Sequence, residues 1–502
     1  MAGIFITYAY IFVQALVGFV YVPMLLHNIG QAEYGLYQLV GSVMSYIISI
    51  NGILSAGVGR FYCKYKAEGN TELMESTLAI AKRIYWVLSV VVLIAIFILA
   101  FVIRAAYSNS LSSDQLDECV AMLIVLGVNT VVTMNNSINY SAITAYERFV
   151  FLKGSQLLSF AIQPFFVYFL TTVYHNALIV TIVVLATNVL CSLAQRIYAK
   201  RILKISYKYH GWDHKLSKGL LFFSGAIVLV TIADQIFWKT DQLIVGYFYG
   251  ASAVAIYSVG AQIYTIYMTI GTAVSSVYLP RVSELYCKNK NMEAISELFV
   301  KVGRVSYIVC GFVLSVFAVL GKDFVALWAG EAYVDAYYIA LIVMVPFTID
   351  LIQNLGLTIM QVANVYLYRG YMYLSIALIN IVATVALLNA IGLVGAAVST
   401  ALAMIVGNGI CMNLYYQKKL GLDIKRFWLE MARISGILIP ITTALLVIYR
   451  VLSSFIAGIC LIVVSTAIYL IIYFVAMWIF ALKPSEKSFI RQRFSAVLRS
   501  SN

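Results

Sequence analysis

The feature that constrains this chain most is a series of apolar runs, each close to the length of a membrane span, that continues almost from end to end. A helix of about 20 apolar residues crosses the hydrocarbon core of a bilayer. Apolar residues make up 63% of the 502 residues and charged residues only 11%, whereas soluble domains carry about 25% charged residues. The runs therefore predict an all-α polytopic membrane protein and exclude a sizeable soluble domain.

Fourteen runs are expected to be transmembrane helices. They cover residues 4–26, 36–58, 84–103, 119–141, 155–173, 177–195, 220–238, 253–279, 305–321, 336–360, 370–388, 393–416, 434–452 and 455–482. If the N-terminus is cytoplasmic, thirty of the 34 Lys and Arg residues lie on cytoplasmic connections and four on outer ones. This asymmetry predicts that both termini are cytoplasmic, and it explains the net charge of +13 without a nucleic-acid partner.

Motifs for metal binding and catalysis are not evident. The seven cysteines are scattered without a CxxC pair, and His210 and His214 lie in a basic loop, where a solvated turn is the simpler interpretation. The outer connections are short and no acid/base constellation is clustered, which disfavours a membrane-embedded glycosyltransferase or polymerase. We therefore expect neither a metal, nor a cofactor, nor an enzymatic reaction.

Two segments resemble each other at an offset of about 220 residues. HNIGQAEYGLYQLVGSVMSYIISI from His27 aligns with YFYGASAVAIYSVGAQIYTIYMTI from Tyr247, which pairs Gly30 with Gly250. Six spans separate the copies, so both halves have the same orientation in the membrane. Parallel repeats of this kind are a transporter architecture with the substrate site between the halves.

The repeat predicts three parts. Residues 1–218 and 219–420 would be two pseudo-symmetric six-helix bundles, and residues 421–502 would hold helices 13 and 14 with a basic cytoplasmic tail.

Polar residues recur along single helical faces in both halves, where exposure to lipid would be costly. We expect them to line a central aqueous cavity between the halves. The alternative is contact between helices, since small and hydroxylated residues also favour close helix packing. The candidate cavity residues are Gln14, Gln38, Ser42, Ser45, Asn129, Asn136, Tyr140, Trp238, Gln262, Thr265, Thr269, Gln353 and Asn354.

Four charged residues are further candidates. Asp234 and Asp350 lie in apolar spans, where they could bind a proton or cation during transport, or form structural hydrogen bonds. Arg60 and Arg281 end two helices on the cytoplasmic side at nearly equivalent points of the repeat. They could hold a phosphate, to which a guanidinium binds in a bidentate manner, or act as topological anchors.

Two regions of the chain resemble a known family. The segment LLHNIGQAEYGLYQLVGSVMSYIISINGILSAGVGRFYCKYKAEGN from Leu25 resembles the opening of polysaccharide biosynthesis proteins, the Wzx-type flippases of lipid-linked oligosaccharides such as O-antigen. TDQLIVGYFYGASAVAIYSVGAQIY, followed by LPRVSELY, resembles the start of their second half. These flippases belong to the multidrug/oligosaccharidyl-lipid/polysaccharide exporter superfamily.

The resemblance implies movement of an undecaprenyl-diphosphate-linked oligosaccharide from the inner to the outer leaflet of a bacterial cytoplasmic membrane. Such a unit would serve lipopolysaccharide O-antigen, capsule or exopolysaccharide, with a polymerase and glycosyltransferases of the same pathway as partners alongside membrane lipids. The alternative within the same fold is a cation-coupled drug exporter of the multidrug and toxin extrusion type. Helices 13 and 14, which those exporters typically lack, favour the flippase.

Overall fold

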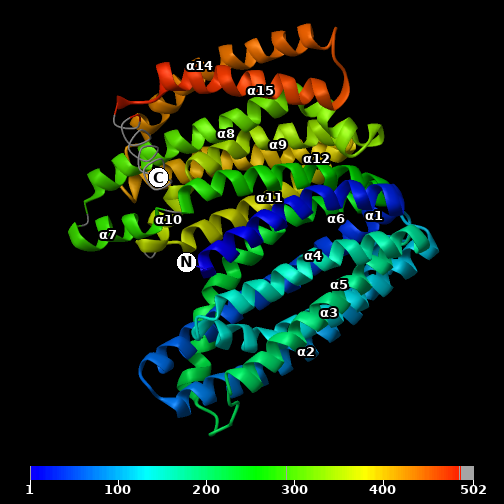
Figure 1. The fold of residues 1–502 in the computed structure, drawn as a ribbon, viewed down its shortest axis with the longest axis vertical. Coiled ribbons are helices and arrows are strands. Elements are labelled where there is room, and N and C mark those ends of the chain that lie inside the picture. Colours follow the sequence, from blue (N-terminus) through cyan, green and yellow to red (C-terminus); the bar gives the residue numbers. More distant parts are fainter. Residues whose placement is uncertain (1, 277, 290, 364, 485–486, 488–502) are drawn as a thin grey trace. The chain divides into compact units, whose positions relative to one another are not determined.

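The chain folds into helices, and no strand occurs in the described residues (Figure 1). The computed structural model describes residues 2–276, 278–289, 291–363, 365–484 and 487. Only the backbone is described at 2–12, 14–16, 50, 52–54, 56, 215, 219, 221–229, 276 and 287–289. In chain order the elements are α1 (Ala2–Ala67), α2 (Thr71–Ala106), α3 (Ser113–Ala145), α4 (Phe149–Tyr174), α5 (Ala177–Ile197), η1 (Tyr198–Ile202), α6 (His214–Ser276), α7 (Leu279–Asn289), α8 (Met292–Trp328), η2 (Glu331–Tyr333), α9 (Asp335–Ile352), α10 (Asn354–Val362), α11 (Leu367–Ile391), α12 (Val394–Met404), η3 (Ile405–Met412), α13 (Asn413–Lys418), α14 (Ile424–Leu452), α15 (Gly458–Ala476) and η4 (Met477–Ala481).

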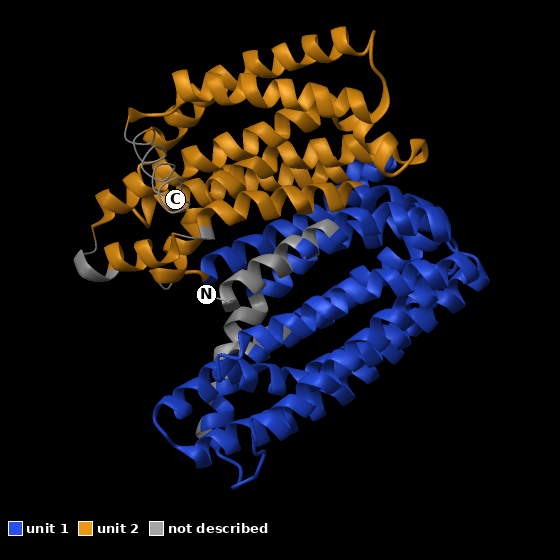
Figure 2. Cartoon of the chain, in the orientation of Figure 1, with its two compact units in different colours: residues 1–259, 367–396 blue, residues 260–366, 397–502 orange. Residues whose placement is uncertain are grey.

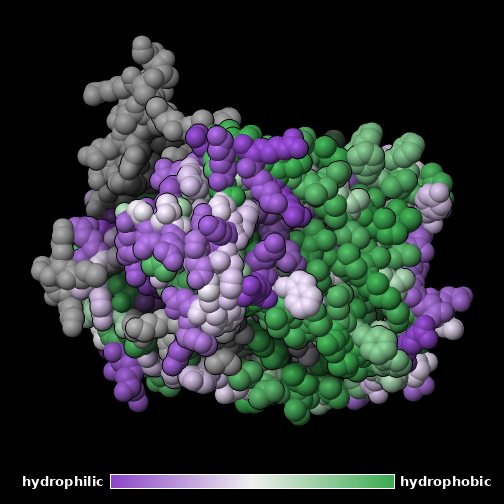
Figure 3. Space-filling model, turned by 90° about the horizontal axis from the view of Figure 1, so that it is seen from below, coloured by the Kyte–Doolittle hydropathy of each residue, from purple (hydrophilic) through white to green (hydrophobic). Residues whose placement is uncertain are grey.

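Eleven helical segments of the described residues are long and apolar enough to cross a membrane. Their apolar side chains also point outwards: Trp86, Phe97 and Phe101 of α2 are 68%, 67% and 62% exposed. Figure 3 shows a broad hydrophobic band across the face in view, with hydrophilic residues on both sides of it. Apolar surface of this extent requires contact with lipid. The predicted all-α polytopic membrane fold is confirmed, whereas the count of fourteen spans stays a prediction.

Two long helices contain a sharp break at a glycine. Gly30 in α1 has φ 83° and ψ 175°, and Gly250 in α6 has φ 75° and ψ −172°. Residues with a Cβ rarely adopt this conformation, whereas glycine does so without steric cost. These are the two glycines that the internal repeat pairs, so the two copies share a backbone conformation as well as a sequence pattern.

The expected span over 336–360 is divided in the structure. α9 ends at Ile352, and Gln353 adopts φ −98° and ψ 2° before α10 begins at Asn354. The Gln353 N–H donates to the Asp350 carbonyl at 3.2 Å, so the backbone stays hydrogen-bonded through the break. Such local bonds are what makes an interrupted helix tolerable inside a membrane. A hydropathy profile averages over a window of residues, so it does not show this break in the helix.

Packing divides the chain into two compact units (Figure 2). Unit 1 contains residues 1–259 and 367–396, and unit 2 contains residues 260–366 and 397–502. α6 contributes to both units, and α11 belongs to unit 1 although it lies in the second half of the sequence. The division expected from the repeat has different boundaries, rests on pseudo-symmetry rather than on packing, and stays a prediction.

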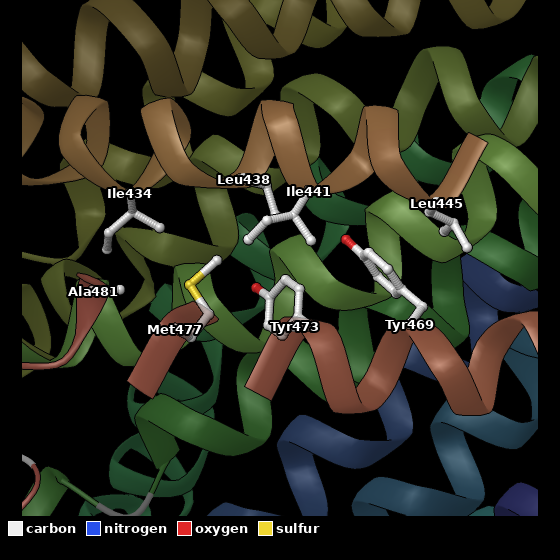
Figure 4. Packing of buried hydrophobic residues seen from close by; sticks show 8 residues of the cluster. All are labelled: Ile434, Leu438, Ile441, Leu445, Tyr469, Tyr473, Met477 and Ala481. Carbon is white, nitrogen blue, oxygen red and sulfur yellow. The ribbon is translucent and has the colours of Figure 1, made fainter. Parts of the chain in front are cut away.

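In unit 2 the last helices pack through one apolar seam (Figure 4). Residues of α14 face residues of α15 and η4 along the seam, and Tyr307, Phe312 and Val316 of α8 pack against it. The buried members are Ile434, Leu438, Ile441, Leu445, Tyr469, Tyr473, Met477 and Ala481.

A buried cluster of charged side chains lies at one end of this apolar seam. Arg304 of α8 donates to the Glu430 carboxylate and, at 2.6 Å, to the Ala481 carbonyl, while Lys483 donates to Glu430 at 2.8 Å. Arg304 is 3% and Glu430 6% exposed. Loss of one partner leaves a buried charge uncompensated, which is strongly destabilising. The cluster therefore ties the end of the last helix to α8 and α14.

We expect Gly250→Ala to destabilise the protein more than Gly30→Ala. Each substitution strains the backbone by about 1–3 kcal/mol because φ is positive. A Cβ at position 250 would also lie 2.9 Å from the Ser110 carbonyl oxygen, whereas one at position 30 meets nothing within 4 Å. Thermal unfolding in detergent should therefore give G250A the lowest midpoint, with G41A, a helical position with open space, close to the native protein. Equal midpoints for G30A, G250A and G41A would contradict this account.

Candidate functional site

Unit 1 contains an open polar cavity of about 430 Å³ among α1, α3, α4 and α5. Its walls carry amides, hydroxyls and two aromatic rings, and none of its lining residues is charged. The volume falls within the range of about 300–1,000 Å³ that is usual for small-molecule sites. We call it the amide cavity. Its lining residues are Asn51, Thr133, Asn136, Ser137, Tyr140, Gln156, Ser159, Phe160, Gln163, Val184, Asn188, Cys191, Ser192 and Gln195.

A second cavity of unit 1, of about 540 Å³, adjoins the first through Asn136 and Ser192, which line both. It lies among α2, α3, α5, η1 and the connection 203–213, and it differs in charge because three cationic side chains and no carboxylate contribute to it. We call it the cationic cavity. Its lining residues are Lys82, Val131, Val132, Asn135, Asn136, Ile138, Asn139, Val189, Ser192, Leu193, Arg196, Lys200 and Tyr207.

A chain of side-chain hydrogen bonds runs along the walls of both cavities. The Tyr207 hydroxyl donates to Asn139 Oδ1 at 2.5 Å, and Asn139 Nδ2 donates to Asn136 Oδ1 at 3.0 Å. Asn136 Nδ2 then donates to Gln195 Oε1 at 2.7 Å, and Gln195 Nε2 donates to Ser155 Oγ at 3.1 Å. Every bond runs in the same direction, so the chain orders α3, α4, α5 and the connection 203–213 at once.

This series of side-chain hydrogen bonds leaves some donors and acceptors available for a ligand. A primary amide has two N–H donors and an oxygen with two lone pairs. Asn136 and Asn139 each use one N–H and one lone pair in the chain, so each keeps one donor and one acceptor. Neutral donors and acceptors beside Tyr140 and Phe160 are suited to the hydroxyls and apolar faces of sugars. The uncharged donors and acceptors of the amide cavity thus match the hydrogen-bonding groups of a neutral polyhydroxylated molecule.

The structure places part of the predicted site in these cavities. Asn136 lines both, and Tyr140 lines the amide cavity. Asn129 lines neither cavity. Its Oδ1 accepts a hydrogen bond at 2.9 Å from Asn188, which lines the amide cavity. The Gln14 side chain lies outside the described residues.

The candidates on the second predicted span contact neighbouring residues rather than either cavity. Gln38 Nε2 donates to the Tyr34 hydroxyl at 2.7 Å, and Ser45 donates to the Ser42 carbonyl at 2.7 Å. Ser42 is 2% exposed and hydrogen-bonds to Gln242 of α6. Ser42 thus joins two helices, as the alternative interpretation of the polar faces expects.

The candidates of unit 2 do not line the cavities of unit 1. Thr265 and Thr269 are exposed and donate to carbonyls one turn earlier in α6. Gln262 and Asn354 are half-buried. Gln353 is 2% exposed and donates to Asn413 Oδ1 at 3.1 Å. Their predicted role in a vestibule between the two halves stays a prediction.

One predicted acidic residue has a cationic partner that the sequence did not indicate. Asp234 Oδ1 lies 3.6 Å from the guanidinium of Arg369, which in turn lies 4.6 Å from the ring centroid of Tyr373. The half-buried Trp238, on the same helix as Asp234, meets the Phe237 ring edge-on at 5.1 Å. Asp350 is half-buried near the end of α9. Ion coupling by either carboxylate stays a prediction.

The two predicted phosphate contacts lie on exposed helix surfaces. Arg60 is exposed near the end of α1, and Arg281 pairs with Glu284 on α7 at 2.7 Å. A phosphate role for either stays a prediction, and for Arg281 the ligand would have to displace a carboxylate.

Sequence reasoning missed several cavity residues that follow the same pattern as those it selected. Asn188, Ser192 and Gln195 share one face of α5, and Gln156, Ser159 and Gln163 share one face of α4. Their helical spacing was a detectable signal. The cations of the second cavity gave no such signal, because their positions at helix ends fit the topological bias of basic residues equally well.

Comparison with known proteins identifies relatives. A family profile described as "Polysaccharide biosynthesis protein" matches residues 1–286. No curated protein matches the chain in sequence. The fold is similar to that of a lipid II flippase, MurJ, in an inward closed conformation (16% identity, TM-score 0.73, covering 95% of this chain and 98% of that one). It is also similar to an inward-facing multidrug resistance MATE family transporter of the MOP superfamily (12% identity, TM-score 0.65, covering 81% and 94%).

A water-soluble thiol reagent should label Cys191, which lines the amide cavity, but not Cys119, which is 0% exposed. The polar walls predict that the amide cavity holds water. Variants that retain one cysteine each would be treated with a charged methanethiosulfonate and weighed by mass spectrometry, with the exposed Cys63 as the positive control. An unlabelled Cys191 beside a labelled Cys63 would show that the cavity is dry.

Proposed function

The chain belongs to the polysaccharide biosynthesis protein family, and on this premise we propose that it moves a lipid-linked oligosaccharide from the inner to the outer leaflet of a bacterial cytoplasmic membrane. The substrate would be an undecaprenyl-diphosphate-linked repeat unit of O-antigen, capsule or exopolysaccharide. Glycosyltransferases of the same pathway would supply this unit, and a polymerase would consume it. The fold shared with a lipid II flippase supports a transporter of this kind.

The observation that carries the proposal is the uncharged lining of the amide cavity. Its amides and hydroxyls match the alternating donors and acceptors of a sugar, and Tyr140 and Phe160 offer rings for its apolar face. A sugar hydroxyl that enters the membrane without a partner loses about 1–3 kcal/mol. A cavity that replaces those lost hydrogen bonds with water-like partners removes this barrier, while the lipid tail stays in the bilayer.

Transport would proceed by alternating access between the two pseudo-symmetric halves, residues 1–218 and 219–420. Residues 421–502 would add helices 13 and 14 at the periphery. The excess of Lys and Arg on one set of connections supports cytoplasmic termini. The glycan would then enter from the cytoplasmic side, where lipid-linked units are assembled.

The second candidate is a cation-coupled multidrug exporter, because the chain shares its fold with a MATE family transporter. An organic cation is stabilised by an opposite charge nearby, such as a carboxylate. Among the residues that the structure describes around the two cavities, neither Asp nor Glu occurs, and Asp234 already lies near Arg369. The described cavities therefore favour a glycan over a drug cation.

Replacing both Asn188 and Gln195 by leucine should abolish most of the glycan export. The double variant removes two amides from the cavity and keeps the side-chain volume similar. The expected effect is about a thirtyfold loss, equivalent to about 2 kcal/mol for two hydrogen bonds of average strength. The assay is surface glycan in a strain that lacks its own flippase and accumulates the lipid-linked intermediate.

The matched control is Asn389→Leu, an exposed amide of α11 that donates only to a carbonyl of its own helix. Export by N389L should equal that of the native chain. Full export by N188L/Q195L would contradict a role for the amide cavity. Restored drug resistance without surface glycan would favour the multidrug exporter over the flippase.

A further inference from the structure

One connection of unit 1 is held in place by its side chains rather than by its backbone. Residues 205–210 follow the π-helical turn η1 and form neither helix nor strand. The Ile205 N–H donates to the Ala199 carbonyl at 3.0 Å, whereas residues 206–210, all of which the structure describes, take part in no backbone–backbone hydrogen bond. We call residues 205–210 the strap. A segment without such bonds can detach without the unfolding of a helix.

Both ends of the strap are bends in the left-handed region of backbone conformation. Lys204 has φ 50° and Gly211 has φ 116°. Glycine adopts a positive φ without steric cost, whereas lysine keeps one only when the surrounding structure holds it there. The strap is thus bounded by two bends, and the bend at Lys204 is strained.

Two side-chain contacts hold the strap against α2. His210 Nε2 lies 2.6 Å from a Glu75 carboxylate oxygen, and the charge of Lys208 lies near the same carboxylate. The Arg83 guanidinium lies 3.4 Å from the ring centroid of Tyr209. The side chains of His210 and Glu75 are 24% and 25% exposed, so solvent reaches both partners. Contacts that water can replace are suited to an attachment that forms and breaks repeatedly.

A third contact joins the strap to the wall of the cationic cavity. Tyr207 lines this cavity, and its hydroxyl donates to Asn139 Oδ1 of α3 at 2.5 Å. Burial raises the pKa of the Tyr207 phenol to about 12, so the phenol keeps its proton at physiological pH and remains a donor. This bond is the first of the series that continues through Asn136 and Gln195. The strap therefore forms part of the cavity wall and supplies the first donor of that series.

The two cavities are small for an oligosaccharide. Their volumes of about 540 Å³ and 430 Å³ suit small molecules. A unit of several sugars needs more room, and a movement of Tyr207 would enlarge the cationic cavity. The strap also joins η1 to α6, so any movement between the predicted halves 1–218 and 219–420 acts on this connection.

We propose that the strap is a detachable part of the cavity wall, which docks on α2 and α3 and whose release widens the cationic cavity to admit the glycan. This inference rests on the proposed function. Release separates His210 from Glu75. It also frees Asn139 Oδ1, which then accepts a hydrogen bond from a sugar hydroxyl.

Release is measured by the reaction of a cysteine in the cavity wall with a bulky thiol reagent. Ser192 lines both cavities, so S192C is introduced into a chain whose seven native cysteines are replaced by alanine. The purified protein is treated with fluorescein maleimide, and labelling is followed by fluorescence. The test variant E75A/H210A should react about tenfold faster, as expected when one hydrogen bond to a charged group no longer holds the docked form.

The matched control is R104A/D117A, which removes an exposed ion pair between α2 and α3 outside both cavities. Its labelling rate should equal that of the S192C parent. Y207F, which keeps the ring but removes the donor to Asn139, should also react faster than the parent. The small reagent N-ethylmaleimide should show a weaker effect, because it needs less room. Unchanged rates in E75A/H210A and Y207F, or an equal rise with both reagents, would overturn the proposal.

Locking the strap separates this proposal from the proposed function. E75C/H210C in the cysteine-free chain, joined by a short bismethanethiosulfonate, should stop transport of lipid-linked oligosaccharide in proteoliposomes, and a reductant should restore it. K64C/E68C, an exposed pair at the end of α1 joined in the same way, should transport normally. Full transport by the joined E75C/H210C chain would refute the strap and leave the flippase proposal intact. If the native chain transports no glycan, the flippase proposal fails, and the labelling rates still decide whether the strap detaches.

Discussion

Inside a bilayer each backbone N–H and C=O has to be hydrogen-bonded within the protein, and this constraint organises the whole molecule. It explains why the described chain is helical, and the breaks inside α1 and α6 use Gly30 and Gly250, which adopt positive φ without a steric penalty. Exposure of polar side chains to lipid is costly as well, and part of the polar side chains of unit 1 line its cavities instead. In unit 1 these side chains form one directional hydrogen-bonded chain from Tyr207 to Ser155.

Much of the fold could be predicted because its causes are local in sequence. Apolar length predicts spans, and the repeat pairs Gly30 with Gly250, which share one backbone conformation. The break at Gln353 could not be predicted, because it depends on backbone hydrogen bonds that hydropathy does not contain. The membership of α11 in unit 1 is equally non-local: Arg369 near Asp234 and Thr384 bonded to Asp241 join segments far apart in sequence.

The candidate site, like the fold, could be predicted from the sequence only in part. Helical spacing identified Asn136 and Tyr140 as cavity residues, and it could have identified Asn188 and Gln195. It could not separate Ser42, which joins helices, from residues that line a cavity, because both kinds occupy the same faces. From the sequence alone, the three cations of the second cavity fit the role of topological anchors. Only the tertiary structure shows that Lys82, Arg196 and Lys200 line one cavity, and that the Glu75 carboxylate contacts His210.

The central proposal is that the sugar of a lipid-linked oligosaccharide occupies the amide cavity of unit 1. The most direct test is photo-crosslinking from a benzophenone amino acid at position 188, in membranes that contain the lipid-linked oligosaccharide, followed by mass spectrometry of the adduct. The account predicts an adduct with the mass of the glycan unit, suppressed by excess unlabelled substrate. Adducts with phospholipid acyl chains alone would contradict it.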